Sequence, residues 1–150
     1  MKKIFIYYSL TGNGDAVAEY LKNKEYNIKK VETSEPLPKN YILSIVAGGY
    51  KAMINYEDKL IEFNNNIEEY DEIVIGSPIW NSRLSSPINT VLKMLDLKDK
   101  KVSFVLYSGS GKSVKATEMI NKEYVNSKII DLKEPKKNRE ELEKLISLTI

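Results

Sequence analysis

The chain has 150 residues, of which 42% are hydrophobic and 29% are charged, a composition typical of a single globular domain. It contains no cysteine and no histidine, which excludes disulfides, iron–sulfur clusters, serine–histidine triads and histidine metal sites. The net charge of +2 comes mostly from lysines that alternate with acidic residues, so we expect no nucleic-acid-binding stripe. Any reactive group is therefore expected to come from a cofactor.

The first predicted element is a strand over residues 4–8, a dense run of β-branched and aromatic side chains. This run is far too short for a secretion signal or a membrane span, so we expect cytoplasmic residence and no membrane partner. Val17 and Leu21, after Gly14, begin a helical pattern. Residues 26–32 are interrupted by charge, which suits a strand at the edge of a sheet.

The middle of the chain is less regular. Asn40 is the only plausible N-cap for a helix over residues 41–47. Residues 48–66 have no clear assignment, although the three asparagines at 64–66 predict a loop. A third strand is expected at residues 73–75, where the apolar run indicates burial on both faces.

The last part of the chain continues the alternation of strands and helices. Residues 102–107 predict a buried strand and residues 128–132 a more polar edge strand. Two helical stripes are expected, one formed by Leu84, Ile88, Val91, Leu92 and Leu95, and one formed by Leu142, Leu145 and Ile146. Glu140 and Glu141 suit the first turn of the second of these helices.

Five strands alternating with about five helices predict an α/β domain spanning residues 1–150. Right-handed crossovers between parallel strands leave few topologies open. Three buried strands and two polar edge strands fit the doubly wound order 2-1-3-4-5, with helices on both faces of the sheet.

Glycines gather where such a sheet binds its ligands. Gly12 and Gly14 follow the first strand, Gly76 closes the third, and Gly109 and Gly111 follow the fourth, so five of the seven glycines lie at carboxyl ends. Ligands of open α/β sheets bind outside these ends, where glycine permits close approach. Any single glycine more often serves a turn, but three adjacent loops together indicate a ligand.

The first loop, residues 9–14, offers hydroxyls and backbone amides at a helix N-terminus, as a phosphate requires. A dinucleotide fingerprint would need glycine where Val17 stands. A P-loop ending at residues 111–113 would need glycine where Leu106 stands. Neither alternative fits the spacing.

The second loop, residues 76–83, contains Trp80, the single tryptophan of the chain. A lone tryptophan is most often part of the core. Here the neighbouring Pro, Asn, Ser and Arg residues favour an exposed stacking surface instead.

These loops resemble those of the flavodoxin superfamily across essentially the whole chain. Residues 9–14 are similar to its S-x-T-G-N-T phosphate element, residues 76–80 to its flavin loop, and residues 48–52 to a segment of its short uncharacterised members. The resemblance implies a flavodoxin-like fold with FMN as cofactor. It assigns the phosphate to Ser9, Thr11, Gly12, Asn13 and Gly14, the isoalloxazine to Ser77, Pro78, Ile79, Trp80 and Asn81, and the pyrimidine edge to Ser108, Gly109, Ser110 and Gly111.

Three departures from the family pattern bear on this assignment. Gly14 stands where a threonine is usual, which removes one phosphate hydroxyl. Asp15 adds a carboxylate near the expected dianion, unless it faces away and serves the helix dipole. No aromatic residue follows Tyr107, so the flavin is expected to have one stacking partner.

The near-neutral charge favours a reductase over an acidic electron carrier. Arg83, Lys51, Lys112 and Lys115 are expected near the strand ends, where they would stabilise reduced flavin or attract an anionic substrate. Our hypothesis is an FMN-dependent NAD(P)H oxidoreductase. The alternatives are a one-electron carrier that serves a redox partner protein, and a non-redox binding module with weak FMN affinity.

Overall fold

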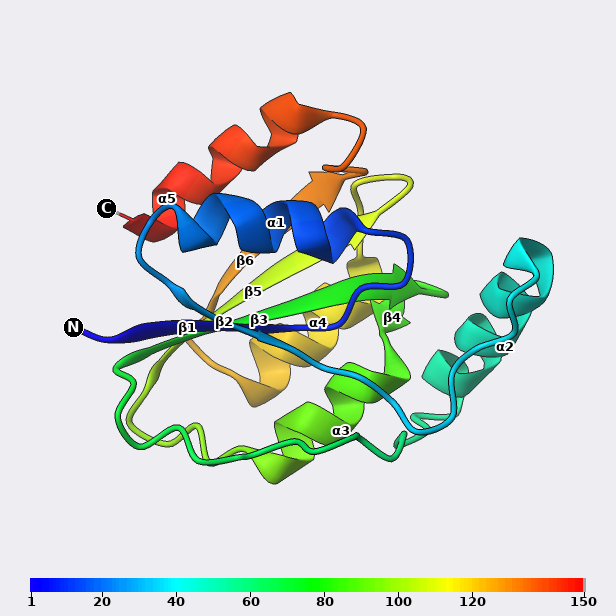
Figure 1. The fold of residues 1–150 in the computed structure, drawn as a ribbon, viewed down its shortest axis with the longest axis horizontal. Helices are drawn as coiled ribbons and strands as arrows, with labels where there is room; N and C mark the ends of the chain where they lie inside the picture. Colours follow the sequence, from blue (N-terminus) through cyan, green and yellow to red (C-terminus); the bar gives the residue numbers. More distant parts are fainter. Residues whose placement is uncertain (150) are drawn as a thin grey trace.

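The computed structural model describes residues 1–149. Its core is a parallel sheet of order β2-β1-β3-β5-β6, which confirms the predicted doubly wound topology (Figure 1). A sixth, two-residue strand pairs antiparallel with β3. The strands are β1 (Lys3–Tyr7), β2 (Asn27–Lys30), β3 (Glu72–Trp80), β4 (Arg83–Leu84), β5 (Lys101–Ser108) and β6 (Lys128–Lys133).

Helices cover both faces of this sheet, as predicted. The helices of the domain are α1 (Asn13–Lys22), α2 (Tyr41–Met53), α3 (Ser86–Met94), α4 (Val114–Glu123), the 3₁₀ helix η1 (Arg139–Leu145) and α5 (Ile146–Thr149), and all but α2 cover the sheet. Figure 1 shows α1, η1 and α5 on one face of the sheet, and α3 and α4 on the other. Alternate residues of β1 supply the two cores: Phe5 packs on the α1 side, while Ile4 and Ile6 pack on the α3 side.

Strand β3 is longer than predicted, because Gly76 lies within it rather than at its end. A Cβ atom at Gly76 would lie 2.5 Å from the ring of Phe5 and 2.8 Å from Cβ of Tyr7. Glycine is therefore needed here for close packing of β1 against β3, and the strand continues to Trp80. The residues expected in the second loop thus form the end of β3 and the β3–β4 hairpin.

The C-terminal segment departs from the predicted α-helix. It begins as a 3₁₀ helix and buries Leu142, Leu145 and Leu148, a spacing of three that matches three residues per turn. Ile146, expected in the apolar stripe, is instead 43% exposed.

Helix α2 stands apart from the layers, beyond the carboxyl ends of the strands (Figure 1). Its predicted cap is confirmed, since Asn40 Oδ1 accepts a hydrogen bond from the amide of Leu43 at 3.2 Å. The helix continues through Gly48 and Gly49 to Met53, in a region with no sequence assignment. The described residues contain no helix that is both long and apolar enough to cross a bilayer.

Candidate functional site

The carboxyl ends of three neighbouring strands surround a cleft of about 280 Å³. Strand β3 pairs with β1 on one side and β5 on the other, so the loops after these strands meet at one edge. The lining residues are Leu10, Thr11, Asn13, Tyr41, Ile45, Pro78, Ile79, Trp80, Asn81, Tyr107, Ser108, Gly109 and Glu134. Eight of the fourteen predicted site residues are among them.

A larger hollow of about 600 Å³ lies at the opposite edge of the sheet. Residues 97–102 and 123–127 line it, between the start of β5 and the start of β6. Ligands of parallel sheets bind at the carboxyl ends, and this hollow lies at the amino ends. The carboxyl-edge cleft is therefore the candidate site.

The first loop is shaped by the hydroxyl of Ser9. Its Oγ accepts hydrogen bonds from the amides of Gly12 at 3.2 Å and Gly14 at 3.0 Å. Gly12 has a φ of 97°, a left-handed conformation that favours glycine. The first amides of a helix have no intrahelical acceptor, so those of Asn13 and Asp15, at the start of α1, are available to an anion. Ser9, Gly12 and Gly14 shape this loop without lining the cleft.

Gly14 occupies the usual threonine position because no side chain fits there. A Cβ atom would lie 2.5 Å from Tyr107 Oη, 2.7 Å from Tyr7 and 2.9 Å from Ser9 Cβ. The Tyr107 hydroxyl donates to the carbonyl of Tyr8, which fixes the ring in this space. Burial raises the pKa of Tyr107 well above its ordinary value, so the phenol stays protonated as a donor.

The carboxylate of Asp15 is neutralised locally. It accepts hydrogen bonds from Lys30 Nζ and from the Tyr7 hydroxyl, both at 2.8 Å. Burial acts to raise the pKa of Asp15, but these hydrogen bonds and the charges of Lys30 and Lys136 lower it overall. Asp15 therefore carries its charge toward β1 and β2, paired with Lys30.

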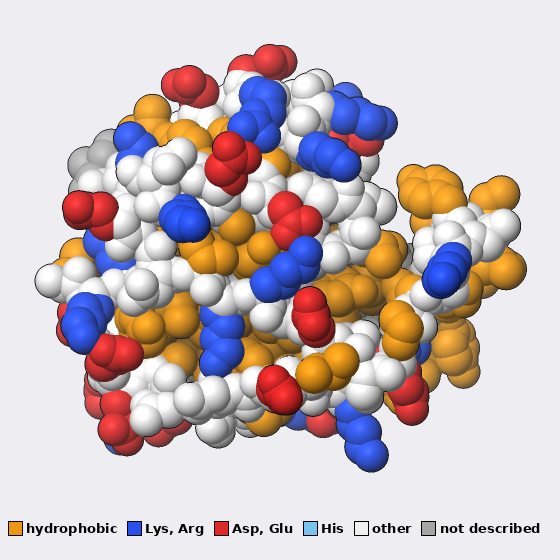
Figure 2. All heavy atoms as spheres, in the orientation of Figure 1, with side chains coloured by type: hydrophobic (Ala, Val, Ile, Leu, Met, Phe, Trp, Pro, Cys, Tyr) orange, Lys and Arg blue, Asp and Glu red, His pale blue; other side chains and the backbone are white. Residues whose placement is uncertain are grey.

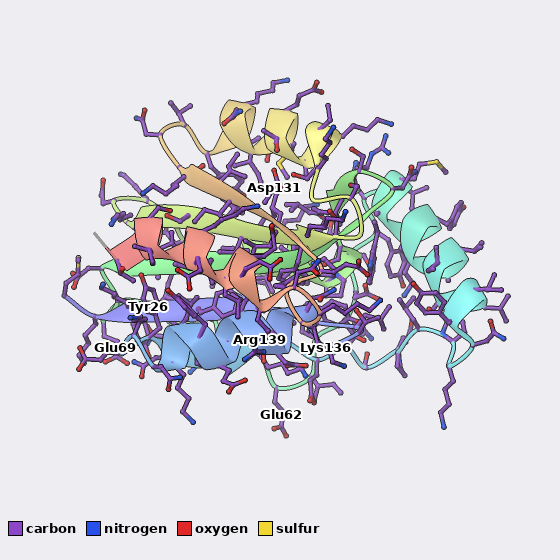
Figure 3. All side chains as sticks on the ribbon, turned by 90° about the horizontal axis from the view of Figure 1, so that it is seen from above. Tyr26, Glu62, Glu69, Asp131, Lys136 and Arg139 are labelled. Carbon is purple, nitrogen blue, oxygen red and sulfur yellow. The ribbon has the colours of Figure 1, made fainter. Side chains whose placement is uncertain are left out.

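Lys136 brings a cation to the first loop, and sequence reasoning missed it. Its backbone amide donates to Asn13 Oδ1 at 3.1 Å, and its Nζ donates to the carbonyl of Thr11 at 3.3 Å. The side chain passes so close to Gly12 that a Cβ there would lie 3.0–3.3 Å from its Cδ, Nζ and Cε. Figure 3 shows Lys136 beside the N-terminal end of α1, near Arg139. An anion held by this helix end would meet a positive charge.

The β3–β4 hairpin forms the next wall of the cleft. Asn81 and Ser82 have φ values of 50° and 62°, the left-handed pair that a tight type I′ turn requires. The Ser82 carbonyl accepts from the amide of Ala116 at 2.8 Å, and its hydroxyl accepts from the amide of Lys115 at 3.2 Å. Ser82 of the hairpin thus caps the N-terminal end of α4, and these two hydrogen bonds fix the position of the hairpin.

Ser77 lies behind this wall. It is fully buried, and its Oγ accepts from the amide of Ser85 and lies 3.0 Å from Ser85 Oγ. The hydroxyl joins β3 to the start of α3 and does not line the cleft. Pro78 and Ile79, the next residues of β3, do line it.

Trp80 is half-buried and presents part of its ring to the cleft. Its indole meets Tyr8 edge-on, with ring centroids 5.7 Å apart. A Cβ atom at Gly48 would lie 3.1 Å from the indole, so the backbone of α2 rests against it. Helix α2 thus supports Trp80 and brings Tyr41 and Ile45 into the lining. These two residues were missed, although Tyr41 adds an aromatic residue to the lining.

The third loop, residues 108–111 at the end of β5, contributes Ser108 and Gly109 to the cleft. A Cβ atom at Gly109 would meet open space. The other two residues predicted at this loop, Ser110 and Gly111, do not line the cleft. Ser108 Oγ accepts from the amide of Gly111 at 2.9 Å, which folds the loop back on itself. Glu134 closes this side, and its amide donates to the carbonyl of Ser108 at 3.0 Å. No motif in the sequence signalled it.

The four cations expected at the strand ends do not line the cleft. Lys51 pairs with Asp58 at 2.8 Å, and Arg83 donates to the carbonyl of Asn81 at 3.2 Å. Lys112 and Lys115 follow the third loop, with Lys115 held against the hairpin through its amide. These three residues, Arg83, Lys112 and Lys115, lie outside the lining, on segments next to the hairpin and the third loop, and we call them the cationic rim.

The chemistry of this cleft fits FMN. Open amides at a helix end beside Lys136 suit a phosphate dianion. Trp80 and Ile79 of β3 and Tyr41 of α2 give the cleft an apolar, aromatic lining suited to a flat aromatic ring. Hydroxyl and backbone groups at Ser108 and Gly109 suit the polar edge of such a ring. The described residues hold no cluster of three or more potential metal-ligating His, Cys, Asp or Glu side chains.

Comparison with known proteins agrees with this description. No curated protein matches the chain. A candidate flavoprotein from Bacteroides eggerthii is 22% identical, with a TM-score of 0.78 over 99% of this chain and 98% of that one. A flavoprotein from Lactobacillus acidophilus, solved in complex with FMN, is 22% identical, with a TM-score of 0.67 over 93% and 97%. An archaeal flavodoxin is 14% identical, with a TM-score of 0.51 over 99% and 96%.

These likenesses confirm the flavodoxin-like fold expected from the sequence. The sequence also matches the family described as NADPH-dependent FMN reductase over residues 1–141, nearly its whole length. The family match supports FMN as the cofactor. The chain therefore belongs to the NADPH-dependent FMN reductase family.

Proposed function

We propose that the protein is an FMN-dependent oxidoreductase that takes reducing equivalents from NAD(P)H. The observation that carries the proposal is the cleft itself, which places an anion-binding helix end and an apolar, aromatic wall at one edge of the sheet. The family match supports the same activity. Bound FMN would supply the two-electron redox chemistry that the side chains lack.

The protein's own residues bind and orient the cofactor. The amides of Asn13 and Asp15, with the Lys136 ammonium, hold the phosphate end. Trp80 and Ile79 on one wall and Tyr41 and Ile45 of α2 on another exclude water from the ring. Lys30 pairs with the Asp15 carboxylate and offsets its negative charge, so this carboxylate does not repel the phosphate.

The cationic rim favours an anionic electron donor. Arg83 follows the hairpin turn, and Lys115 lies in the first turn of α4, with its amide bonded to the Ser82 hydroxyl of that hairpin. A nicotinamide dinucleotide carries phosphates that such a rim would attract. The rim cations thus serve the substrate, whereas Lys136 serves the cofactor.

The test is anaerobic mixing of FMN-loaded protein with NADPH or NADH while the visible flavin absorbance is followed. We expect bleaching by at least one nucleotide, with a saturable dependence on its concentration. Lys112→Ala combined with Lys115→Ala is expected to raise the nucleotide concentration at which bleaching saturates. The control is Lys122→Ala, in the last turn of α4. Flavin that dithionite reduces but neither nucleotide bleaches would contradict the proposal.

One observation favours the one-electron carrier as a second candidate. Glu134 lines the cleft, and its carboxylate pairs only loosely with Lys137 at 3.3 Å. A carboxylate at this position opposes a negative charge on fully reduced flavin. Stepwise reduction that accumulates a one-electron-reduced form, together with indifference to both nucleotides, would favour a carrier serving a redox partner protein. If Trp80 fluorescence shows no quenching on FMN addition, the weak-binding module is favoured instead.

A further inference from the structure

Helix α2 has an inverted amphipathic pattern. The side it turns toward the protein consists of small residues, Ser44, Gly48 and Ala52, all of them buried. Its large apolar side chains point to solvent, with exposures from 49% at Met53 to 71% at Ile42. Figure 2 shows the hydrophobic side chains crowded on the projecting part of the molecule that Figure 1 identifies as α2. Such a surface on a soluble domain indicates an interaction site.

The exposed apolar surface is large enough for a stable interface. It is formed by Tyr41, Ile42, Leu43, Ile45, Val46, Tyr50 and Met53. Together these residues expose an area comparable to the roughly 800 Å² that each partner buries in a standard-size protein interface. Within this set, residues 42, 46, 50 and 53 recur at helical spacing, so they form one continuous stripe.

The chemistry of α2 indicates which partner covers it. The helix has no acidic residue, and its one cation, Lys51, is paired with Asp58 at 2.8 Å. A partner of complementary charge would therefore find no charge to recognise. A helix that lies on a membrane surface needs a basic polar face opposite its apolar face. The opposite face of α2 is instead packed against the β3–β4 hairpin through Gly48 and Trp80.

We propose that α2 pairs with α2 of a second copy of this chain, antiparallel about a twofold axis. An uncharged apolar stripe is complementary to itself, as an isologous contact requires. Tyr41 and Ile45 belong both to the exposed surface and to the cleft lining, so the interface adjoins the cofactor cleft. The proposal goes beyond the redox function and does not depend on it.

The first test is sedimentation equilibrium of the full chain with and without FMN, from about 1 μM to about 500 μM. We expect a dimer. Ile42→Glu combined with Val46→Glu should weaken dimerisation at least about a hundredfold, because it places charges in an apolar contact. Val125→Glu is the matched control, since Val125 is 72% exposed but lies between α4 and β6. Circular dichroism verifies folding, which exposed positions should leave unchanged.

A second test does not depend on charged variants. The chain has no cysteine, so Val46→Cys introduces a single thiol near the middle of α2. Mild oxidation should link two copies through Val46→Cys and leave Val125→Cys monomeric. A wild-type chain that stays monomeric throughout the range, a dimer that survives the charged variant, or equal cross-linking at both positions would overturn the proposal. So would binding of the monomer through α2 to vesicles of phosphatidylcholine and phosphatidylglycerol.

Discussion

Helices α1 and α2 both begin beside the cleft, yet they contact the rest of the protein through opposite kinds of surface. Helix α1 buries Val17 and Leu21 completely against the sheet. Helix α2 instead buries Gly48 and Ala52 and leaves its large side chains in solvent. Apolar area removed from water is the main source of folding free energy. Helix α1 is therefore part of the stable core, while α2 relies on a few specific contacts.

Those contacts lie at the hairpin and at the end of α2. Trp80 rests against Gly48, and Lys51 forms an ion pair with Asp58, which is 3% exposed. Elements with little buried apolar surface open at low free energy cost. The wall of the cleft that α2 supplies is thus adjustable, whereas the wall that the first loop supplies is rigid.

The largest expected effect tests the rigid side. Gly14→Ala should destabilise the protein by about 3 kcal/mol, the upper end of the usual overpacking range, because the methyl group would overlap Tyr107 and Tyr7. Urea unfolding measures this change. Gly109→Ala is the control, since a Cβ there meets open space. An equal effect at both positions would show that the first loop is no tighter than the third.

A somewhat smaller effect tests the anchor of α2. Asp58→Ala should destabilise the protein by about 2 kcal/mol, below the usual cost of breaking a buried pair because Lys51 can turn to water. The substitution also leaves the Ser86 hydroxyl without its carboxylate acceptor. Thermal or urea unfolding measures the loss.

Two further variants show whether this loss comes from the ion pair. Glu57→Ala removes an exposed carboxylate that pairs with Lys93, and it should change stability little. Adding Lys51→Met to Asp58→Ala should recover part of the loss, because no unpaired ammonium remains. If the double variant is no more stable than Asp58→Ala, the loss of stability comes from the Ser86 hydrogen bond and not from the ion pair.

The third prediction concerns the cation at the first loop. Lys136→Met should weaken FMN binding about fivefold, or about 1 kcal/mol, as expected for a solvent-accessible charge pair. Riboflavin, which lacks the phosphate, should bind equally well to both proteins. Calorimetric titration with the two flavins measures the difference, and Lys24→Met, in the turn after α1, is the control. An equal loss for both flavins would mean that Lys136 acts by shaping the loop.

The topology could be predicted because buried and edge strands differ in composition. Residues 73–75 and 104–107 are uninterrupted apolar runs, whereas the edge strands carry charge. The loops after β1, β3 and β5 were recognised by their glycines. The end of the third strand was predicted too early, at Gly76. A glycine required for packing against Phe5 looks the same in sequence as one that ends a strand.

Contributions from distant segments to the cleft could not be predicted. Lys136 and Glu134 follow β6, more than a hundred residues after the loop that Lys136 contacts, and no local pattern marks them. Helix α2 carries its apolar residues on the side away from the core, so the usual rule of burial assigns its faces incorrectly. The family-like segment at residues 48–52 was the one available signal, and its two glycines concealed the helix.

The smallest predicted effect separates those two glycines. Gly49→Ala should stabilise the protein by about 0.5–1 kcal/mol, because alanine favours the helix interior and the nearest atom to its Cβ, on Asn81, is 3.8 Å away. Gly48→Ala should lose this gain, since its Cβ would lie 3.1 Å from the indole.

Trp80 is the only tryptophan in the sequence, so its fluorescence reports directly on this contact. The emission should shift in Gly48→Ala and stay unchanged in Gly49→Ala, while urea unfolding ranks the two stabilities. Equal stabilisation by both alanines, with unchanged emission, would mean that α2 does not rest on Trp80. The adjustable wall of the cleft would then lack its main contact with the hairpin, and the contrast with α1 would be greater still.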